Sequence, residues 1–267
     1  MKNRLPPGDK YNLRTIERAL SVFKVFLAQN APSEMTLNQL SQGVGLSPST
    51  TFRLLHSLRA SGFIEQNQEN GRYRLGVACL ALGDAFLKSN DLRQRAYAAL
   101  MDLRDQCGET VHLAFREGGE VVYLDKLAGL HPIGLMSSRV GGRAPTHCTA
   151  LGKALLSHLP EQELRALLAK MPLTRYTNKT ITQVDQLLEE LRQVRIQGFA
   201  IDNEEHEAGA GCIACPIFDH RGVVAAISVS GPVDRILKGR ENLVRLIKET
   251  AREVSAQMGG RLLHGDG

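Results

Sequence analysis

The sequence LSPSTTFRLL at residues 46–55 contains the start of a helix, and the fold of the first third of the chain depends on that helix. Ser47 is a typical N-cap, and Pro48 suits the first helical position, where a missing N–H costs nothing. Gly62 is placed to end the helix, which we expect to run to about Ser61. Its inward-facing residues are predicted to be Phe52, Leu55 and Leu58.

Two further helices are predicted before this one. Thr36 suits the N-cap of a short helix, and a tight turn at Gly45 and Leu46 joins it to the helix that follows. The inward residues of this short helix are predicted to be Leu37, Leu40 and Val44. An earlier helix, ending near residues 30–32, is indicated by apolar residues every three or four positions, namely Ile16, Leu20, Phe23 and Leu27.

The short helix and the one after it form a helix-turn-helix, because a short turn containing glycine joins them. The second helix of such a unit enters the major groove of DNA. Its outward face carries side chains that can hydrogen-bond to base edges or phosphates, namely Ser49, Thr50, Arg53 and Ser57. An ordinary amphipathic helix with a solvated polar face fits the same pattern.

A hairpin is predicted directly after the helix-turn-helix. Residues 63–66 and 72–75 are short strands, and the loop between them ends in Asn70-Gly71, which is a strong turn signal. Arg72 and Arg74 alternate with apolar residues, so both are expected to point outward. The pattern predicts a winged helix-turn-helix whose wing arginines lie on the phosphate backbone or in the minor groove. Arg14, Arg18 and Arg59 are further candidates for phosphate contact.

The positive charge of the chain is concentrated in the same region. The 267 residues carry 33 Lys and Arg against 28 Asp and Glu, a net charge of +5. Residues 1–90 hold 11 basic and 6 acidic side chains, whereas residues 91–267 hold 22 of each. All of the excess charge therefore lies in the first third, as expected when one module contacts a polyanion and the other does not.

Composition narrows the class of protein. The chain is 43% apolar, which is ample for one large or two smaller cores, and no apolar run approaches the roughly 18 residues of a membrane span. Residues 1–11 are polar and lack the apolar core of a signal peptide. Five scattered cysteines do not suggest a disulfide framework. We expect a soluble cytoplasmic protein with no membrane partner.

The remaining two-thirds alternate strands with helices. A hairpin is predicted across Gly118-Gly119, and another across residues 219–222. The predicted strands are 110–116, 120–126, 131–137, 199–201, 212–218 and 223–230, and the predicted helices are 76–88, 92–107, 150–157, 162–170, 183–195 and 241–258. Hairpins with flanking helices predict an α+β domain built on an antiparallel sheet.

Three stretches of small and hydroxyl-bearing residues are candidates for a ligand site. Residues 144–153 lead into a helix whose free N–H groups favour an anion, although Thr149 also fits as a simple N-cap. The glycines of residues 209–212 permit close approach to a ligand or simply form a turn. Ser228 and Ser230 share one strand face and can bind a polar ligand, or satisfy each other.

Metal and redox chemistry are weaker alternatives. Residues 202–207 combine Asp, Glu and His, which could bind a metal with His147 or Cys212 nearby, although a polar loop of this kind is usually solvated. The C-x-x-C spacing of Cys212 and Cys215 lies in a predicted strand, where residues three apart face opposite ways. We therefore expect no metal and no cofactor.

The run at residues 46–55, followed by Leu58, Gly62-Phe63 and residues 73–76 (YRLG), resembles the DNA-binding domain of the IclR family of bacterial transcriptional regulators. The resemblance continues to the C-terminus and covers almost the whole chain. It implies a winged helix-turn-helix domain at residues 1–75, a linker helix at 76–90 that helps a dimer form, and a GAF-like effector-binding domain at 91–267.

The predicted DNA-binding set is Ser47, Ser49, Thr50, Thr51, Arg53, Ser57, Arg59, Arg72 and Arg74. The resemblance implies an effector-binding set of Ala150, Leu151, Ala210, Cys212, Ser228 and Ser230, with the N–H groups of the first two facing a carboxylate. Relatives often have a bulkier aliphatic residue where this chain has Ala210, which suggests a roomier pocket.

The sequence therefore predicts a transcriptional regulator, a repressor of a catabolic operon, that binds a palindromic site on double-stranded DNA as a dimer or a dimer of dimers. A small organic acid would control binding. One alternative is a cysteine- or metal-dependent enzyme acting on a small organic acid, with Cys148 or Cys212 as nucleophile and His147 or His206 as base. Another is a DNA-binding protein whose C-terminal domain only oligomerises.

Overall fold

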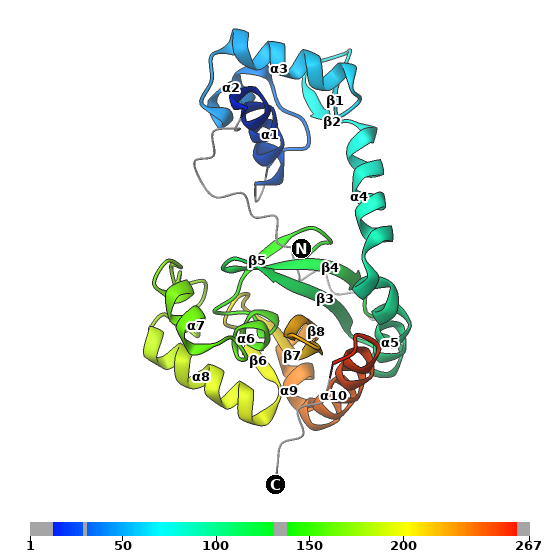
Figure 1. The fold of residues 1–267 in the computed structure, drawn as a ribbon, viewed down its shortest axis with the longest axis vertical. Coiled ribbons are helices and arrows are strands. Elements are labelled where there is room, and N and C mark those ends of the chain that lie inside the picture. The colour runs from blue at the N-terminus through cyan, green and yellow to red at the C-terminus, as the bar shows by residue number, and fades with distance from the viewer. Residues whose placement is uncertain (1–12, 29–30, 131–137, 261–267) are drawn as a thin grey trace. The chain divides into compact units, whose positions relative to one another are not determined.

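A computed structural model describes residues 13–28, 31–130 and 138–260 of the chain. The chain divides into two compact units, Met1–Ser89 and Asn90–Gly267, and each is described by itself below (Figure 1). Among the described residues, no helix is both long enough and apolar enough to span a membrane.

The first unit contains the predicted winged helix-turn-helix. Its elements are α1 (Arg14–Leu27), α2 (Leu37–Val44), α3 (Pro48–Ala60), β1 (Ile64–Gln66), β2 (Tyr73–Leu75) and α4 (Val77–Ser89). Thr36 caps α2 in a capping box with Gln39, and Gly45 takes the left-handed conformation (φ +68°) that the turn after α2 requires. The Ser47 hydroxyl accepts from the N–H of Thr50 at the start of α3. Local capping chemistry thus sets both ends of the turn.

Packing in this unit differs from the prediction at α3. Leu55 is fully buried and Leu58 is half-buried, as predicted, but Phe52 is 49% exposed. Thr51 and Leu54 are buried instead. The prediction for Phe52 was wrong because the inward face passes through residue 51, and the next residue is turned by about 100° around the helix axis.

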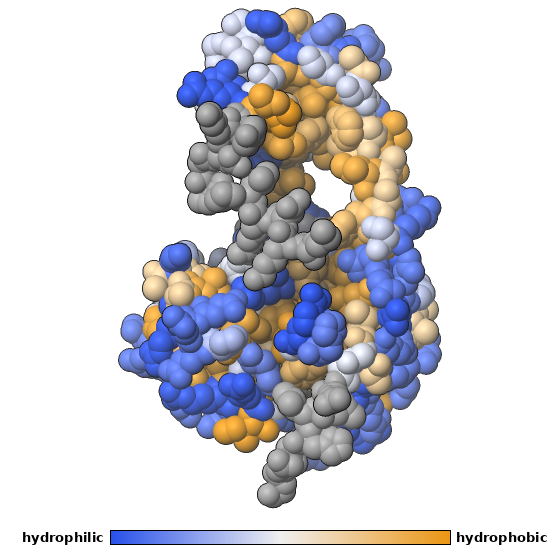
Figure 2. Space-filling view, in the orientation of Figure 1, coloured by the Kyte–Doolittle hydropathy of each residue, from blue (hydrophilic) through white to orange (hydrophobic). Residues whose placement is uncertain are grey.

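Two helices of the first unit have apolar faces that are exposed among the residues that the structure describes. The apolar residues that indicated α1 in the sequence lie mainly on its outer side. Ile16, Leu20 and Leu27 are more than half exposed, whereas Val22 is buried. The helix α4 has no buried residue. Its large apolar side chains Val77, Leu80, Leu82 and Phe86 are exposed, and in Figure 2 the helix is drawn mostly in the colours of apolar residues.

The second unit is built on a six-stranded antiparallel sheet in the order β5-β4-β3-β8-β7-β6 (Figure 1). The strands are β3 (Thr110–Glu117), β4 (Glu120–Leu127), β5 (Arg143–Pro145), β6 (Ala200–Asn203), β7 (Ala210–Asp219) and β8 (Gly222–Pro232). The helices are α5 (Asp91–Cys107), α6 (Ala150–Leu156), α7 (Glu161–Leu168), α8 (Val184–Gln197), α9 (Val233–Lys238) and α10 (Arg240–Gln257).

The two faces of the sheet have different partners. Helix α6 packs on the face that carries Ala114, Ala214 and Ala226. Because side chains alternate along a strand, Leu113, Ile213 and Ile227 point to the other face, and α5 and α10 contact the same strands. The α+β class with an antiparallel sheet is therefore confirmed.

Most predicted elements of this unit are present within a few residues. The short strand β5 and the six-residue helix α9 were missed, since neither is long enough to show a period. The strand predicted at residues 131–137 lies outside the described residues.

Gly152 is required by a close backbone approach. It is the third residue of α6, and a Cβ atom there would lie 2.2 Å from the carbonyl oxygen and 2.3 Å from the Cα of Thr146. We expect Gly152→Ala to lower the free energy of unfolding by about 3 kcal/mol, because the clash is with backbone. Gly119→Ala is the matched control, since its Cβ would meet only the flexible side chain of Met171. Equal urea midpoints for the two variants would contradict this reading.

Candidate functional site

The outer surface of α3 in the first unit is polar and basic. Arg53, His56 and Ser57 are exposed there, and so is Ser49 at the beginning of the helix. A groove of about 500 Å³ runs between α1 and α3. It is lined by Thr15, Arg18, Thr50, Phe52, Arg53, Leu54, His56 and Ser57. The structure thus brings Arg18 of α1 to the same surface as the predicted recognition residues of α3.

Not every predicted residue of α3 is free to contact DNA. Thr51 is fully buried and its hydroxyl donates to the carbonyl of Ser47, so its side chain is not presented on the outer surface of α3. The hydroxyls of Ser47 and Thr50 lie 2.9 Å apart in the helix cap. Ser57 donates to the carbonyl of Arg53, which leaves the Arg53 guanidinium as the strongest exposed donor on this helix.

The wing arginines differ in their surroundings. Arg74 lies opposite Glu65 in the β1–β2 register and contacts its carboxylate at 3.1 Å, with Glu34 at 3.6 Å. Arg59 donates to the side chain of Gln66 at 2.7 Å. Arg72 is exposed and has no ion pair with the residues that the structure describes. The wing therefore offers one unpaired cation and one that is already partly neutralised.

In the second unit, register places polar side chains together on the α6 face of the sheet. One row across the strands contains Asp202, Cys212 and Ser230. The next row contains Ser228 and His112. Ala210 lies two residues before Cys212 in β7 and is buried. The predicted residues Cys212, Ser228 and Ser230 thus lie together on adjacent strands. His112, which is distant from them in sequence, lies beside them.

Two aromatic residues at this surface were missed in the sequence. His112 is fully buried, and its Nδ1 lies 3.3 Å from the hydroxyl of Ser228 and 3.4 Å from that of Ser230. Tyr123 lies beside it, with ring centroids 5.2 Å apart and rings inclined at 53°, and packs against the buried apolar cluster of this face. Strand alternation could have revealed His112, because it is two residues from Ala114 on the same face.

The beginning of α6 lies over the same surface. Ala150 and Leu151 belong to the buried cluster against which Cys212 and Tyr123 pack. Thr149 caps the helix by accepting from the N–H of Gly152 at 3.1 Å. The N–H groups of Ala150 and Leu151 find no acceptor among the described residues. Thr149 thus caps the helix while the N–H groups of Ala150 and Leu151 stay available to a ligand, so the N-cap role of Thr149 does not exclude an anion site at this helix start.

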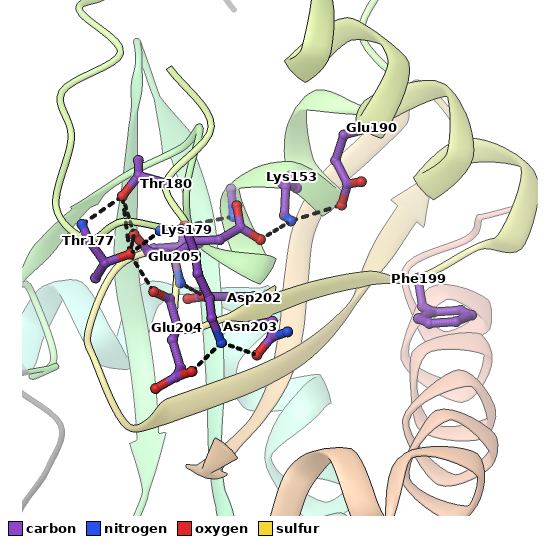
Figure 3. Close-up of polar contacts among 12 residues, drawn as sticks. Lys153, Thr177, Lys179, Thr180, Glu190, Phe199, Asp202, Asn203, Glu204 and Glu205 are labelled. Carbon is purple, nitrogen blue, oxygen red and sulfur yellow. Dashed lines mark hydrogen bonds and ion pairs between the residues drawn. The ribbon is translucent and has the colours of Figure 1, made fainter. Parts of the chain in front are cut away.

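A buried ion cluster holds α6 in position (Figure 3). The side chain of Lys153 is 1% exposed, and its Nζ lies 2.6 Å from Glu205 Oε1 and 2.9 Å from Glu190 Oε1. Burial opposes the charged form of Lys153, but the two carboxylates outweigh it and raise the pKa of the lysine. Asp202 accepts from the N–H of Glu205 at 2.7 Å, and burial raises the pKa of its carboxyl to about 7.

The loop that carries Glu205 is fixed from outside as well. Glu204 has a φ of +59°, and its Oε1 accepts from the N–H of Gly209 at 2.8 Å. Thr177 and Thr180 each donate to a carbonyl of this loop at 2.6 Å, and Lys179 pairs with Glu204 (Figure 3). These contacts engage the carbonyls of Glu204 and Glu205 and the N–H of Gly209, so the protein itself binds both ends of this polar loop.

The geometry does not favour the enzyme alternative. Burial raises the pKa of Cys148 and of Cys212, which disfavours the nucleophilic thiolate. His147 uses Nε2 to contact the carbonyl of Thr174 at 3.0 Å, and the His206 ring lies 5.1 Å from the ring of Tyr176. Within the described ranges, no three His, Cys, Asp or Glu side chains are grouped to hold a metal ion.

The winged helix-turn-helix of the first unit defines a DNA-binding protein. The chain matches two family models, the IclR helix-turn-helix domain over residues 15–68 and the bacterial transcriptional regulator IclR C-terminal domain over residues 84–256. The chain belongs to the IclR family. It is a DNA-binding transcriptional regulator, and the relatives described next are regulators and not enzymes.

Similar proteins cover nearly the whole chain. The HTH-type transcriptional regulator XynR of Escherichia coli (strain K12) is 39% identical over 84% of this chain and 88% of its own length. The transcriptional repressor IclR of the same organism is 34% identical over 93% of this chain and 91% of its own.

Solved structures agree with this placement. Thermotoga maritima IclR has a TM-score of 0.74 and 33% identity, covering 92% of this chain and 98% of that one. An IclR homolog from Microbacterium hydrocarbonoxydans, complexed with 4-hydroxybenzoate, has a TM-score of 0.79 and 26% identity, covering 91% and 98%.

The buried carboxyl of Asp202 makes stability depend on pH. Its pKa is raised in the folded protein, so the folded state keeps this proton while the unfolded state has lost it, and stability falls as pH rises from about 4 to about 7. Asp202→Asn retains the acceptor for Glu205 without the charge. We expect its stability advantage over the wild type to grow by up to about 1.4 kcal/mol per pH unit in that window. Urea unfolding at pH 5 and pH 8 checks this, and a constant difference would refute it.

Proposed function

We propose that this regulator is a repressor of a catabolic operon whose operator binding is controlled by a small organic acid. The observation that carries the proposal is the polar surface beneath α6. There, α6 begins with the N–H groups of Ala150 and Leu151, which have no acceptor among the described residues, and it packs on the sheet face that also carries the hydroxyls of Ser228 and Ser230. Such a site binds a carboxylate through local donors, without a matching cation.

The similar proteins support both halves of this proposal. Relatives are named as repressors, and one homolog of similar structure was crystallised with an aromatic acid. The proposed effector contacts are Ala150, Leu151, Ala210, Cys212, Ser228 and Ser230. With Thr51 removed, the proposed DNA contacts are Ser47, Ser49, Thr50, Arg53, Ser57, Arg59, Arg72 and Arg74. The protein would act in the cytoplasm, where the operator is.

The exposed apolar faces of α1 and α4 support a homo-oligomer. Four large apolar side chains of α4 and three of α1 face solvent in a single chain, and burying apolar area is the main driving force for association. A second copy of the chain is the occupant that a two-fold operator requires, because its two half-sites repeat one helical turn apart, about 34 Å. We propose a dimer, which can pair further into a dimer of dimers, on a palindromic operator.

The link between the two activities is a shift in population. The acid would bind one arrangement of the dimer more tightly than the other, and only this difference in affinity changes how the two recognition helices match their half-sites. The proposal therefore requires that the acid and the operator change each other's affinity by the same factor.

Arg53 tests the DNA interface. We expect Arg53→Ala to weaken binding to a specific operator by about 1–3 kcal/mol if its guanidinium reads a base, and to weaken non-specific binding much less. Fluorescence anisotropy with operator and scrambled duplexes at one salt concentration measures both. Arg192→Ala, an exposed arginine on α8 paired with Glu189, is the matched control. Unchanged operator affinity in Arg53→Ala would remove it from the recognition set.

Ser228 tests the effector site. We expect Ser228→Ala to keep wild-type operator affinity in the absence of acid, while the acid concentration that changes operator binding rises by about tenfold, the equivalent of one lost buried hydrogen bond. Titrating organic acids into the protein–operator complex measures this concentration. Ser157→Ala replaces a buried serine of the same unit whose contacts are local. An unaltered response in Ser228→Ala would mean that the effector binds elsewhere.

A further inference from the structure

Phe52 is an apolar side chain on the polar outer surface of α3. Of the residues of α3, all of which the structure describes, it is the only large apolar one that is exposed, at 49%. Ser49 lies three positions before it and His56 four positions after it, so these three residues share one face of the helix. Half of an aromatic side chain is thus left in water on the surface that a helix-turn-helix presents to DNA.

The surface around Phe52 is positively charged. The groove of about 500 Å³ between α1 and α3 is lined by Phe52 together with Arg18 and Arg53. Neither arginine has an ion pair with any residue that the structure describes. A second copy of the chain placed on this surface through a two-fold axis would bring the same cations together, which is unfavourable. A polyanion neutralises both arginines while it covers the ring, so charge complementarity favours DNA as the partner of this surface.

The position of Phe52 along α3 suits contact with base edges. It is the fifth residue of the helix, and the N-terminal residues of a recognition helix are those that reach the bases. Its ring carries no hydrogen-bonding group, so it gains only from apolar contact. The apolar group that bases present in the major groove is the C5 methyl of thymine, whereas their other exposed groups are donors and acceptors. A ring that covered one of those polar groups would leave it unpaired, at a cost in free energy.

We infer that Phe52 is a specificity-determining residue, which selects thymine at one position of each half-site by covering its C5 methyl group. This inference rests on the proposed placement of α3 in the major groove. It adds an apolar contact to a proposed set of DNA contacts that is otherwise made of hydroxyls and guanidinium groups. The discrimination that Phe52 supplies is independent of salt, because an apolar contact neutralises no phosphate and so releases no counterion.

Deoxyuridine tests the inference on the full-length protein, because its base is thymine without the C5 methyl. The probe is a duplex that the wild-type protein selects from a random library, with copies in which one thymine at a time is replaced by uracil. We expect replacement at one position of each half-site to weaken wild-type binding about fourfold, the contribution of one buried methyl group. If no replacement weakens binding, the inference fails and the proposed DNA interface stands. If no duplex is enriched, the proposed placement of α3 fails as well.

Variants of Phe52 assign the methyl contact to its ring. Phe52→Ala should bind the thymine and uracil duplexes equally at that position, while the dependence of its affinity on salt stays that of the wild type. Phe52→Leu keeps an apolar side chain and should retain part of the preference for thymine. Ile196→Ala, which removes an exposed apolar side chain from α8, is the matched control and should retain all of it.

Two results for Phe52→Ala would overturn the inference. Undiminished sensitivity to uracil would assign the methyl contact to another residue. Equal weakening of binding to every duplex, together with a loss of dimer in analytical ultracentrifugation, would assign the ring to an interface between copies of the chain. Because Phe52 is half exposed, we expect both of its variants to unfold near the wild-type temperature, and thermal unfolding followed by circular dichroism checks this.

Discussion

The ammonium of Lys153 is the charge on which the second unit depends. Three elements meet at it, namely α6 that carries it, α8 through Glu190 and the loop after β6 through Glu205. A buried ion of this kind is stable only while its partners remain, because removing one leaves an uncompensated charge at a cost of about 3–5 kcal/mol. The cluster therefore fixes α6 above the sheet more by excluding other arrangements than by adding net stability. The same cluster therefore also positions the proposed effector site, because the backbone donors of that site, Ala150 and Leu151, are the first residues of α6.

Local rules predicted much of this fold. Thr36, Gly45 and Ser47 sit at the helix ends where their side chains and backbone preferences place them, and strand alternation put Ser228 and Ser230 on one face. The errors arise where tertiary packing decides. Thr51 is buried where Phe52 was predicted to be, one helical position away. In α1, Ile16, Leu20 and Leu27 of the predicted apolar stripe are exposed, and only Phe23 packs against the core. Nothing in the sequence marked Lys153 as buried, because its partners come from segments 37 and 52 residues away.

The two units are suited to bind negatively charged partners by different physical means. The first carries the whole net charge of the protein and exposes Arg53 and Arg72, which suits a polyanion whose attraction acts over about a Debye length. The second is neutral overall and its candidate site is lined by hydroxyls, backbone N–H groups and an uncharged imidazole. A small anion held in this way is recognised by direction and distance, so its binding is expected to respond little to ionic strength. Salt is thus expected to separate the two activities experimentally.

The pairing of Arg74 with Glu65 changes the thermodynamics of the wing. A free arginine that reaches a phosphate releases a condensed counterion from DNA, and each such contact steepens the dependence of affinity on salt by about 0.9 in logarithmic slope. Arg74 must first give up a carboxylate at 3.1 Å, so it exchanges one ion pair for another. The Glu65 carboxylate that it leaves behind then recruits a cation of its own. The wing is therefore expected to release fewer counterions from DNA than its two arginines suggest, because the Glu65 carboxylate competes with the DNA phosphate for Arg74.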